Sequence, residues 1–70
     1  MASIQRIENA VNNLINGNLS DARRSARGLT YSEIFNWLTY SVGWSENRSR
    51  ACADYLKNRI DFQAYCNADR

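Results

Sequence analysis

The sequence predicts an all-α fold, a compact bundle of four to five short helices. Apolar residues recur at helical spacing, proline is absent, and each of the three glycines closes one helical pattern just before the next start signal. These glycines are Gly17, Gly28 and Gly43. With 70 residues the chain is expected to form a single domain, residues 1–70, with a frayed tail at residues 68–70.

An apolar stripe at spacings of three and four residues predicts the first helix, over about residues 3–16. The stripe consists of Ile4, Ile7, Val11, Leu14 and Ile15. Ser3 is the expected N-cap, and Gly17 is the expected left-handed residue after the helix.

A second, short helix is expected over about residues 20–27, with Ser20 as its N-cap. Arg23, Arg24 and Arg27 follow in its C-terminal half, where the helix dipole favours cations. Capping electrostatics and solvation are the simpler interpretation of these arginines, and contact with a ligand is the alternative.

The third helix, residues 31–42, has the clearest local start signal in the chain. Thr30 and Glu33 have capping-box spacing, and Leu29 with Ile34 has that of a hydrophobic staple. On a helical wheel the core face consists of Tyr31, Ile34, Phe35, Leu38 and Val42. Trp37 and Tyr40 fall outside this face, so the core of this helix does not require them.

Two further helices are expected, over about residues 46–59 and 62–67. Ser45 and Asp61 are their predicted N-caps, and Trp44 is expected to pack back on Leu38 after Gly43. The expected apolar side of the longer helix is formed by Cys52, Ala53, Leu56 and Ile60. Arg50, Asp54 and Lys57 follow at spacings that predict a solvated ladder of ion pairs on the other side.

Composition argues against several functional classes. The chain has no histidine, and its two cysteines lack CxxC spacing, so we expect no metal, no cofactor and no enzyme activity. Cys52 and Cys66 are expected to be reduced and buried, and a single disulfide between them is the alternative. The sequence has no apolar run long enough to suggest a leader or a membrane span, and the expected location is cytoplasmic.

Nucleic-acid binding is the alternative function. A formal net charge of +2 is too small to indicate it alone, but leaves it open. Residues 30–59 resemble a helix-turn-helix, with the second helix presenting basic side chains to DNA or RNA, although the first helix runs one turn too long. The candidate residues for that function are Arg48, Arg50, Lys57 and Arg59.

Protein binding is the preferred hypothesis. Surplus aromatic residues and arginine are typical of interface hot spots, so the expected partner-binding residues are Trp37, Tyr40 and Trp44, with a charged rim of Arg23, Arg24 and Arg27. The expected partner is a larger protein or complex, and a homodimer is an alternative.

Two broader resemblances bear on this hypothesis. Small histidine-free helical proteins of this size resemble the accessory inhibitors and regulators made by phages and other mobile elements. The stretch from Val42 to Ser45 resembles the Met-Gly-Phe-Ser loop of ubiquitin-associated domains, which would imply a three-helix unit binding through that loop. Val42 stands where that loop has methionine, and we interpret the stretch as helix punctuation.

Overall fold

The structure, a computed structural model, describes residues 2–68, with side chains from residue 4 onward. It confirms the all-α prediction, with five α-helices in the described chain. These are α1 (Ala2–Ile15), α2 (Leu19–Ser25), α3 (Tyr31–Asn36), α4 (Glu46–Leu56) and α5 (Phe62–Asn67). A π-helix, η1 (Trp37–Val42), continues α3 without interruption.

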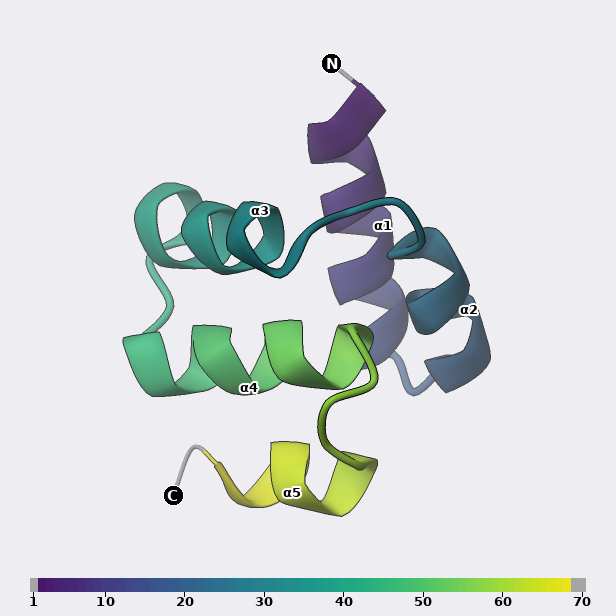
Figure 1. The fold of residues 1–70 in the computed structure, drawn as a ribbon, viewed down its shortest axis with the longest axis vertical. Coiled ribbons are helices and arrows are strands. Elements are labelled where there is room, and N and C mark those ends of the chain that lie inside the picture. The colour runs from purple at the N-terminus through teal and green to yellow at the C-terminus, as the bar shows by residue number, and fades with distance from the viewer. Residues whose placement is uncertain (1, 69–70) are drawn as a thin grey trace.

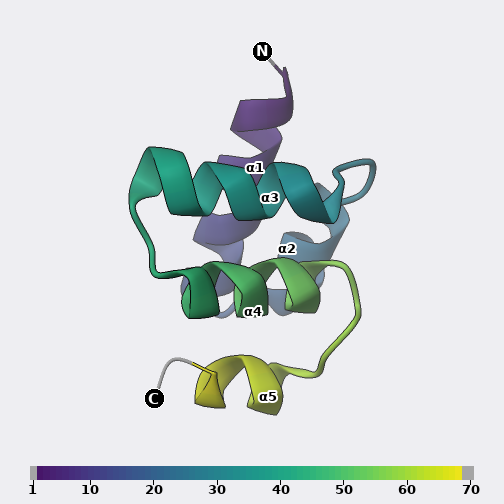
Figure 2. The ribbon, with the colours of Figure 1, turned by 60° about the vertical axis from the view of Figure 1, so that its left-hand side comes forward.

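The helices form two antiparallel hairpins and an added short helix (Figures 1 and 2). Helices α1 and α2 make the first hairpin, and α3–η1 with α4 makes the second. Helix α1 runs steeply across the second hairpin, and α5 lies along α4 on the side away from α3. The arrangement therefore differs from a three-helix unit.

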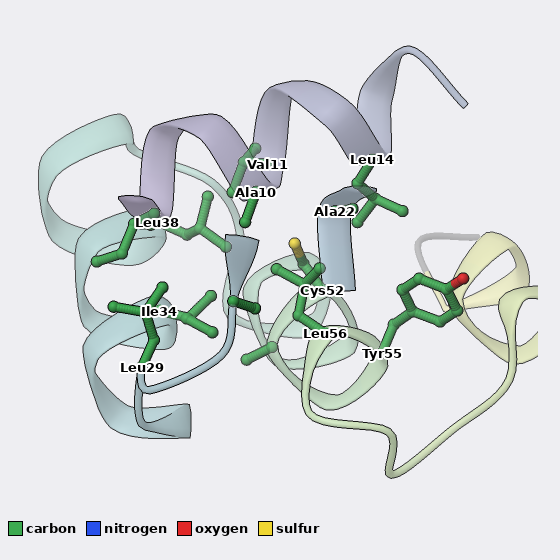
Figure 3. Packing of buried hydrophobic residues seen from close by; sticks show 13 residues of the cluster. Ala10, Val11, Leu14, Ala22, Leu29, Ile34, Leu38, Cys52, Tyr55 and Leu56 are labelled. Atoms are coloured by element: carbon green, nitrogen blue, oxygen red, sulfur yellow. The ribbon is translucent and has the colours of Figure 1, made fainter. Parts of the chain in front are cut away.

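The core lies between the two hairpins, where side chains from α1, α2, α3, η1 and α4 meet (Figure 3). The largest fully buried side chains include Ile34, Leu38 and Cys52. Buried alanines, among them Ala10, Ala22 and Ala53, let the helix backbones approach closely. Most of the core is thus supplied by small and aliphatic side chains. Tyr55 is its one buried aromatic residue among those described, and the partly buried rings pack around its margin.

Several predicted helix ends are confirmed. Thr30 accepts a hydrogen bond from the Glu33 amide, and the Glu33 carboxylate accepts one from the Thr30 amide, completing the capping box. Ser45 and Asp61 cap α4 and α5 through their side-chain oxygens. Gly43 is left-handed at φ 90°, and the amides of Gly43 and Trp44 both donate to the Leu38 carbonyl.

Two predicted N-caps are wrong. Helix α1 already includes Ala2, so Ser3 lies inside it. Helix α2 begins at Leu19 after Asn18, whose side chain makes no capping bond, and Ser20 is the second residue of the helix. A serine in the first turn of a helix cannot be told from an N-cap serine by sequence alone, and this explains both errors.

Helix α4 stops at Leu56, three residues before the predicted end at Arg59. Asn58 is left-handed at φ 62°, and the Arg59 amide donates to the Asp54 carbonyl, so Asn58 takes the place that glycine usually holds in this C-cap. Helix α2 also ends earlier than residue 27, at Ser25.

The predicted apolar stripes are only partly buried. Ile4 and Ile15 are 48% and 57% exposed, although Ile7, Val11 and Leu14 are buried as predicted. Val42, placed in the core by the helical wheel, is 44% exposed. It lies in η1, where the wider π-helical turn shifts side chains from their α-helical positions.

Candidate functional site

The most exposed aromatic side chain of residues 4–68, Tyr40, lies at the η1 end of the second hairpin, at the left of Figure 1. Tyr40 is 77% exposed, and Val42 is the other exposed large apolar side chain of η1. Trp37 and Trp44 are half-buried and pack against the core. We call Trp37, Tyr40, Val42 and Trp44, which η1 and the two residues after it bring to this end of the hairpin, the η1 face.

Arg48 adds a positive charge beside the η1 face. Its guanidinium carbon lies 3.8 Å from the centre of the Trp44 ring, a cation–π contact that holds the charge at the edge of the aromatic surface. Arg48 also faces a cavity of about 300 Å³ that it lines together with Ala51, Tyr65 and Cys66. Of the residues predicted for nucleic-acid binding, Arg48 is the one placed next to the aromatic cluster.

Two groups near Arg48 have raised pKa values: Tyr65, which lines the cavity, and Cys52, which is buried in the core. Burial raises the pKa of the Tyr65 hydroxyl, and the nearby thiol of Cys52 adds to the increase, while Arg48 acts in the opposite direction. Burial likewise raises the pKa of the Cys52 thiol to about 12, again opposed by Arg48. Both groups are therefore held in their neutral forms at neutral pH.

The predicted cysteine environment is half correct. Cys52 and Cys66 are unpaired, and Cys52 is fully buried in the core. Cys66 is exposed on α5, contrary to the expectation that both thiols are buried. Helix α5 packs with one side only and has no buried residue, which leaves Cys66 in solvent.

The three arginines predicted as a rim lie elsewhere. Helix α2, which carries Arg23 and Arg24, lies across the molecule from η1 in both views (Figures 1 and 2). Arg23 stacks on the Tyr55 ring at 4.1 Å, and Arg24 pairs with Asp21 at 3.2 Å. Arg27 is exposed just beyond the helix. The structure thus does not join this cluster to the η1 face.

The second hairpin also differs from a helix-turn-helix, because α3–η1 and α4 run antiparallel side by side (Figure 2). A helix-turn-helix instead holds its two helices at about 90–120°. Its candidate residues separate: Arg48 lies at the η1 end, Arg50 lines a second cavity of about 280 Å³ with Asp54 and Ile60, and Lys57 and Arg59 follow at the far end of α4.

The predicted ladder of Arg50, Asp54 and Lys57 does not form. Among the side chains of residues 4–68, the ion pair within 4.0 Å is that of Arg24 with Asp21. Lys57 lies at the C-cap of α4, where the chain already leaves the helical path on which the ladder depends.

Two contacts that sequence reasoning missed join distant parts of the chain. Arg23 donates from Nε to the Tyr55 carbonyl at 3.4 Å, across 32 positions of sequence. Arg59 lies over the Tyr31 ring at 4.8 Å. Periodicity and capping signals are local, so they carry no information about such pairs. Only the general affinity of arginine for aromatic faces would have suggested them.

Within residues 2–68, no three His, Cys, Asp or Glu side chains come together in a way that could hold a metal ion. None of the helices described there is long and apolar enough to cross a membrane. No protein-family model matches the chain, and no curated protein or solved structure shows significant similarity to it. Functional inference therefore depends on the chain's own surfaces.

Proposed function

We propose that the protein is a non-enzymatic binding module that docks on a larger protein through the η1 face, acting as an accessory inhibitor or regulator by occupying that surface. The observation that carries the proposal is the exposure of Tyr40, 77% of whose surface faces solvent. Aromatic side chains are enriched in the hot spots of protein interfaces, where they enter pockets on the partner.

The surroundings of Tyr40 support this role. Val42, two residues further along η1, adds a second exposed apolar side chain. Trp37 and Trp44 are half-buried and pack against the core. Arg48, stacked on Trp44, supplies a charge at the margin, as is usual for the polar rim of an interface. A rigid aromatic anchor loses little conformational entropy on binding.

The size of the molecule sets the extent of such a contact. A standard protein interface buries about 800 Å² on each partner. The described chain has an accessible surface of 4409 Å², so a contact of that size would take up roughly a fifth of it. The partner must therefore cover the whole η1 end, including the exposed polar residues between the aromatic ones.

Affinity capture from the lysate of the native host, with and without nuclease, tests the proposal. We expect the wild-type chain to retain a nuclease-insensitive protein, and the double variant Tyr40→Ser/Val42→Ser to lose it while keeping its helical circular dichroism. Ile15→Ser is the matched control, because Ile15 is also an exposed large apolar residue but lies at the end of α1. Equal capture by wild type and the double variant would refute the proposal.

A photo-crosslinking residue at position 40 identifies the contact directly. The proposal predicts an adduct with the captured protein from position 40 and none from position 15. Sedimentation of the purified chain distinguishes a second copy: a dimer dissociated by Tyr40→Ser would mean that the η1 face serves self-association instead.

A further inference from the structure

Five cations gather at the edge of the molecule opposite η1. Arg23 contacts Tyr55 near the end of α4, Lys57 is the C-cap of α4, and Arg59 contacts Tyr31 at the start of α3. The other two, Arg6 and Arg27, lie next to Gly28: Arg27 precedes it in sequence, and an Arg6 nitrogen is 3.5 Å from where a Cβ on Gly28 would stand. We call Arg6, Arg23, Arg27, Lys57 and Arg59 the basic edge.

The edge is assembled by tertiary structure. Figure 2 shows the start of α3 and the loop after α4 on the same side of the molecule, with α2 behind them. Arg23 and Arg59 are held in place by stacking on tyrosine rings, at 4.1 and 4.8 Å from the ring centres. A stacked guanidinium keeps N–H groups at its rim free to donate to an anion.

Three carboxylates have partners other than the cations of the edge. Asp21 pairs with Arg24 at 3.2 Å, Glu33 accepts the Thr30 amide at 2.9 Å, and Asp61 accepts the Ala64 amide at 2.8 Å. None of them lies within 4.0 Å of a cation of the basic edge. The positive charges there are thus not neutralised by direct pairing within residues 4–68.

Helix dipoles offset only part of the positive charge of the basic edge. The C-terminal ends of α2 and α4 both lie near the edge, and each is equivalent to about half a negative charge. Two such ends offset about one of the five cations. The remaining charge favours an anionic partner.

The chemistry of the edge fits a phosphate backbone better than a protein surface. Four of its five cations are arginines, whose planar N–H groups bind phosphate in a bidentate way. No exposed large apolar side chain belongs to segments 23–31 or 57–59. Ile4, two residues before Arg6, and Phe62, whose ring is 5.8 Å from that of Tyr55, flank the edge. The edge thus lacks the apolar centre typical of protein interfaces.

The rings at this edge are also unsuited to stacking unpaired bases. Tyr55 is 3% exposed and has Arg23 over its face. Tyr31 is half-buried, with Arg59 over its ring and Phe35 stacked against it. Single-strand binding sites usually offer open aromatic faces to successive bases. We propose that the basic edge binds the phosphodiester backbone of a nucleic-acid duplex, without reading its sequence, independently of the η1 face.

Fluorescence anisotropy with a labelled 20-base-pair DNA duplex tests this proposal. We expect binding at 50 mM KCl, similar for two unrelated sequences, that weakens about 100-fold or more by 200 mM, as four to five phosphate contacts require. The double variant Arg27→Gln/Arg59→Gln should weaken binding at least tenfold and reduce the slope of log K against log salt by about two.

Arg50→Gln is the matched control, because Arg50 is an exposed arginine of α4 outside the edge. It should change affinity by less than about threefold, through long-range charge alone. The Arg27 side chain is exposed and makes no hydrogen bond or ion pair within residues 4–68, so Arg27→Gln alone should keep the thermal transition. It provides a second variant if loss of the Arg59 contact with Tyr31 lowers the thermal transition of the double variant.

Three outcomes would overturn the proposal. One is no binding at 50 mM salt, and another is an equal loss in Arg50→Gln and the double variant. The third is a labelled polyglutamate peptide or a single strand that binds more tightly than the duplex, which would identify an acidic protein segment or unpaired bases as the preferred partner. The double variant keeps the η1 face intact, so protein capture should survive it.

Discussion

The backbone amide of Trp44 donates a 2.9 Å hydrogen bond to the carbonyl of Leu38, six residues earlier. The amide of Gly43 donates to the same oxygen at 3.0 Å. This closure is one residue wider than the usual C-terminal motif of an α-helix, because η1 is π-helical. It fixes the position of Trp44, and with it one side of the η1 face.

Replacing Gly43 by alanine should therefore destabilise the fold through the backbone alone. At φ 90° an L-residue is strained, while a Cβ at this position meets no atom within 4 Å. We expect a loss of about 1 kcal/mol in the free energy of unfolding, measured by urea titration. Ser41→Ala, on the same exposed turn, is the control and should differ little from wild type.

Capping substitutions should separate the true helix starts from the mistaken one. Thr30→Ala removes the acceptor of the capping box and should cost about 1 kcal/mol of stability. Ser20→Ala should be neutral or slightly stabilising, because Ser20 lies inside α2 and caps nothing. Thermal unfolding of both variants distinguishes them, and equal losses would show that Ser20 also caps a helix.

Ser49→Ala should stabilise the protein. Ser49 is fully buried in α4, and its hydroxyl has no hydrogen-bond partner. Removing a buried, unsatisfied hydroxyl recovers its desolvation cost, about 1 kcal/mol, and alanine also has the higher helix propensity. Chemical denaturation should show a higher midpoint with an unchanged slope, whereas a lower midpoint would mean that the hydroxyl is bonded in solution.

Stability should fall as pH rises above about 9, because Cys52 stays protonated in the folded chain. Burial raises the pKa of its thiol from 9.0 to about 12, so between these values only the unfolded state loses the proton. Stability from this group is fully present below pH 9 and is lost progressively up to about pH 12. Urea titrations should show a decrease of about 1 kcal/mol between pH 8 and 10.

Cys52→Ala provides the comparison for this pH effect. Tyrosine and lysine side chains also titrate in alkali, and burial raises the pKa of Tyr65, which adds to the loss at still higher pH. The variant should be less stable at pH 7 but should show a weaker dependence on pH from 8 to 10. The same slope in both proteins would assign the effect to other groups.

Helix caps and left-handed glycines were predicted correctly where they depend only on neighbouring residues. The capping box at Thr30, the caps at Ser45 and Asp61, and the left-handed glycines depend on residues within a few positions of one another. The end of α4 was missed because Asn58, and not a glycine, adopts the left-handed conformation there. Asparagine tolerates the left-handed conformation, so Asn58 itself was the sequence signal for the end of α4.

The candidate surfaces were less predictable because they depend on which helix ends meet. A wheel with 3.6 residues per turn places Val42 in the core, and the π-helical turn carries it outward instead. The rim assigned to Arg23 and Arg24 required α2 to lie beside η1, but the hairpin of α1 and α2 places them across the molecule. The spacing of residues in the sequence predicts neither the π-helical turn nor the position of α2 relative to η1.

Helix α5 is attached to the rest of the fold by few contacts, and this has a consequence for how the protein opens. Phe62 and Tyr65 both pack their rings against Tyr55, at 5.8 and 5.9 Å, while no residue of α5 is fully buried. A segment with so little burial is expected to detach at a lower free energy than global unfolding. Its amide protons should exchange with solvent first, and each such opening would briefly uncover the side of α4 around Ala51.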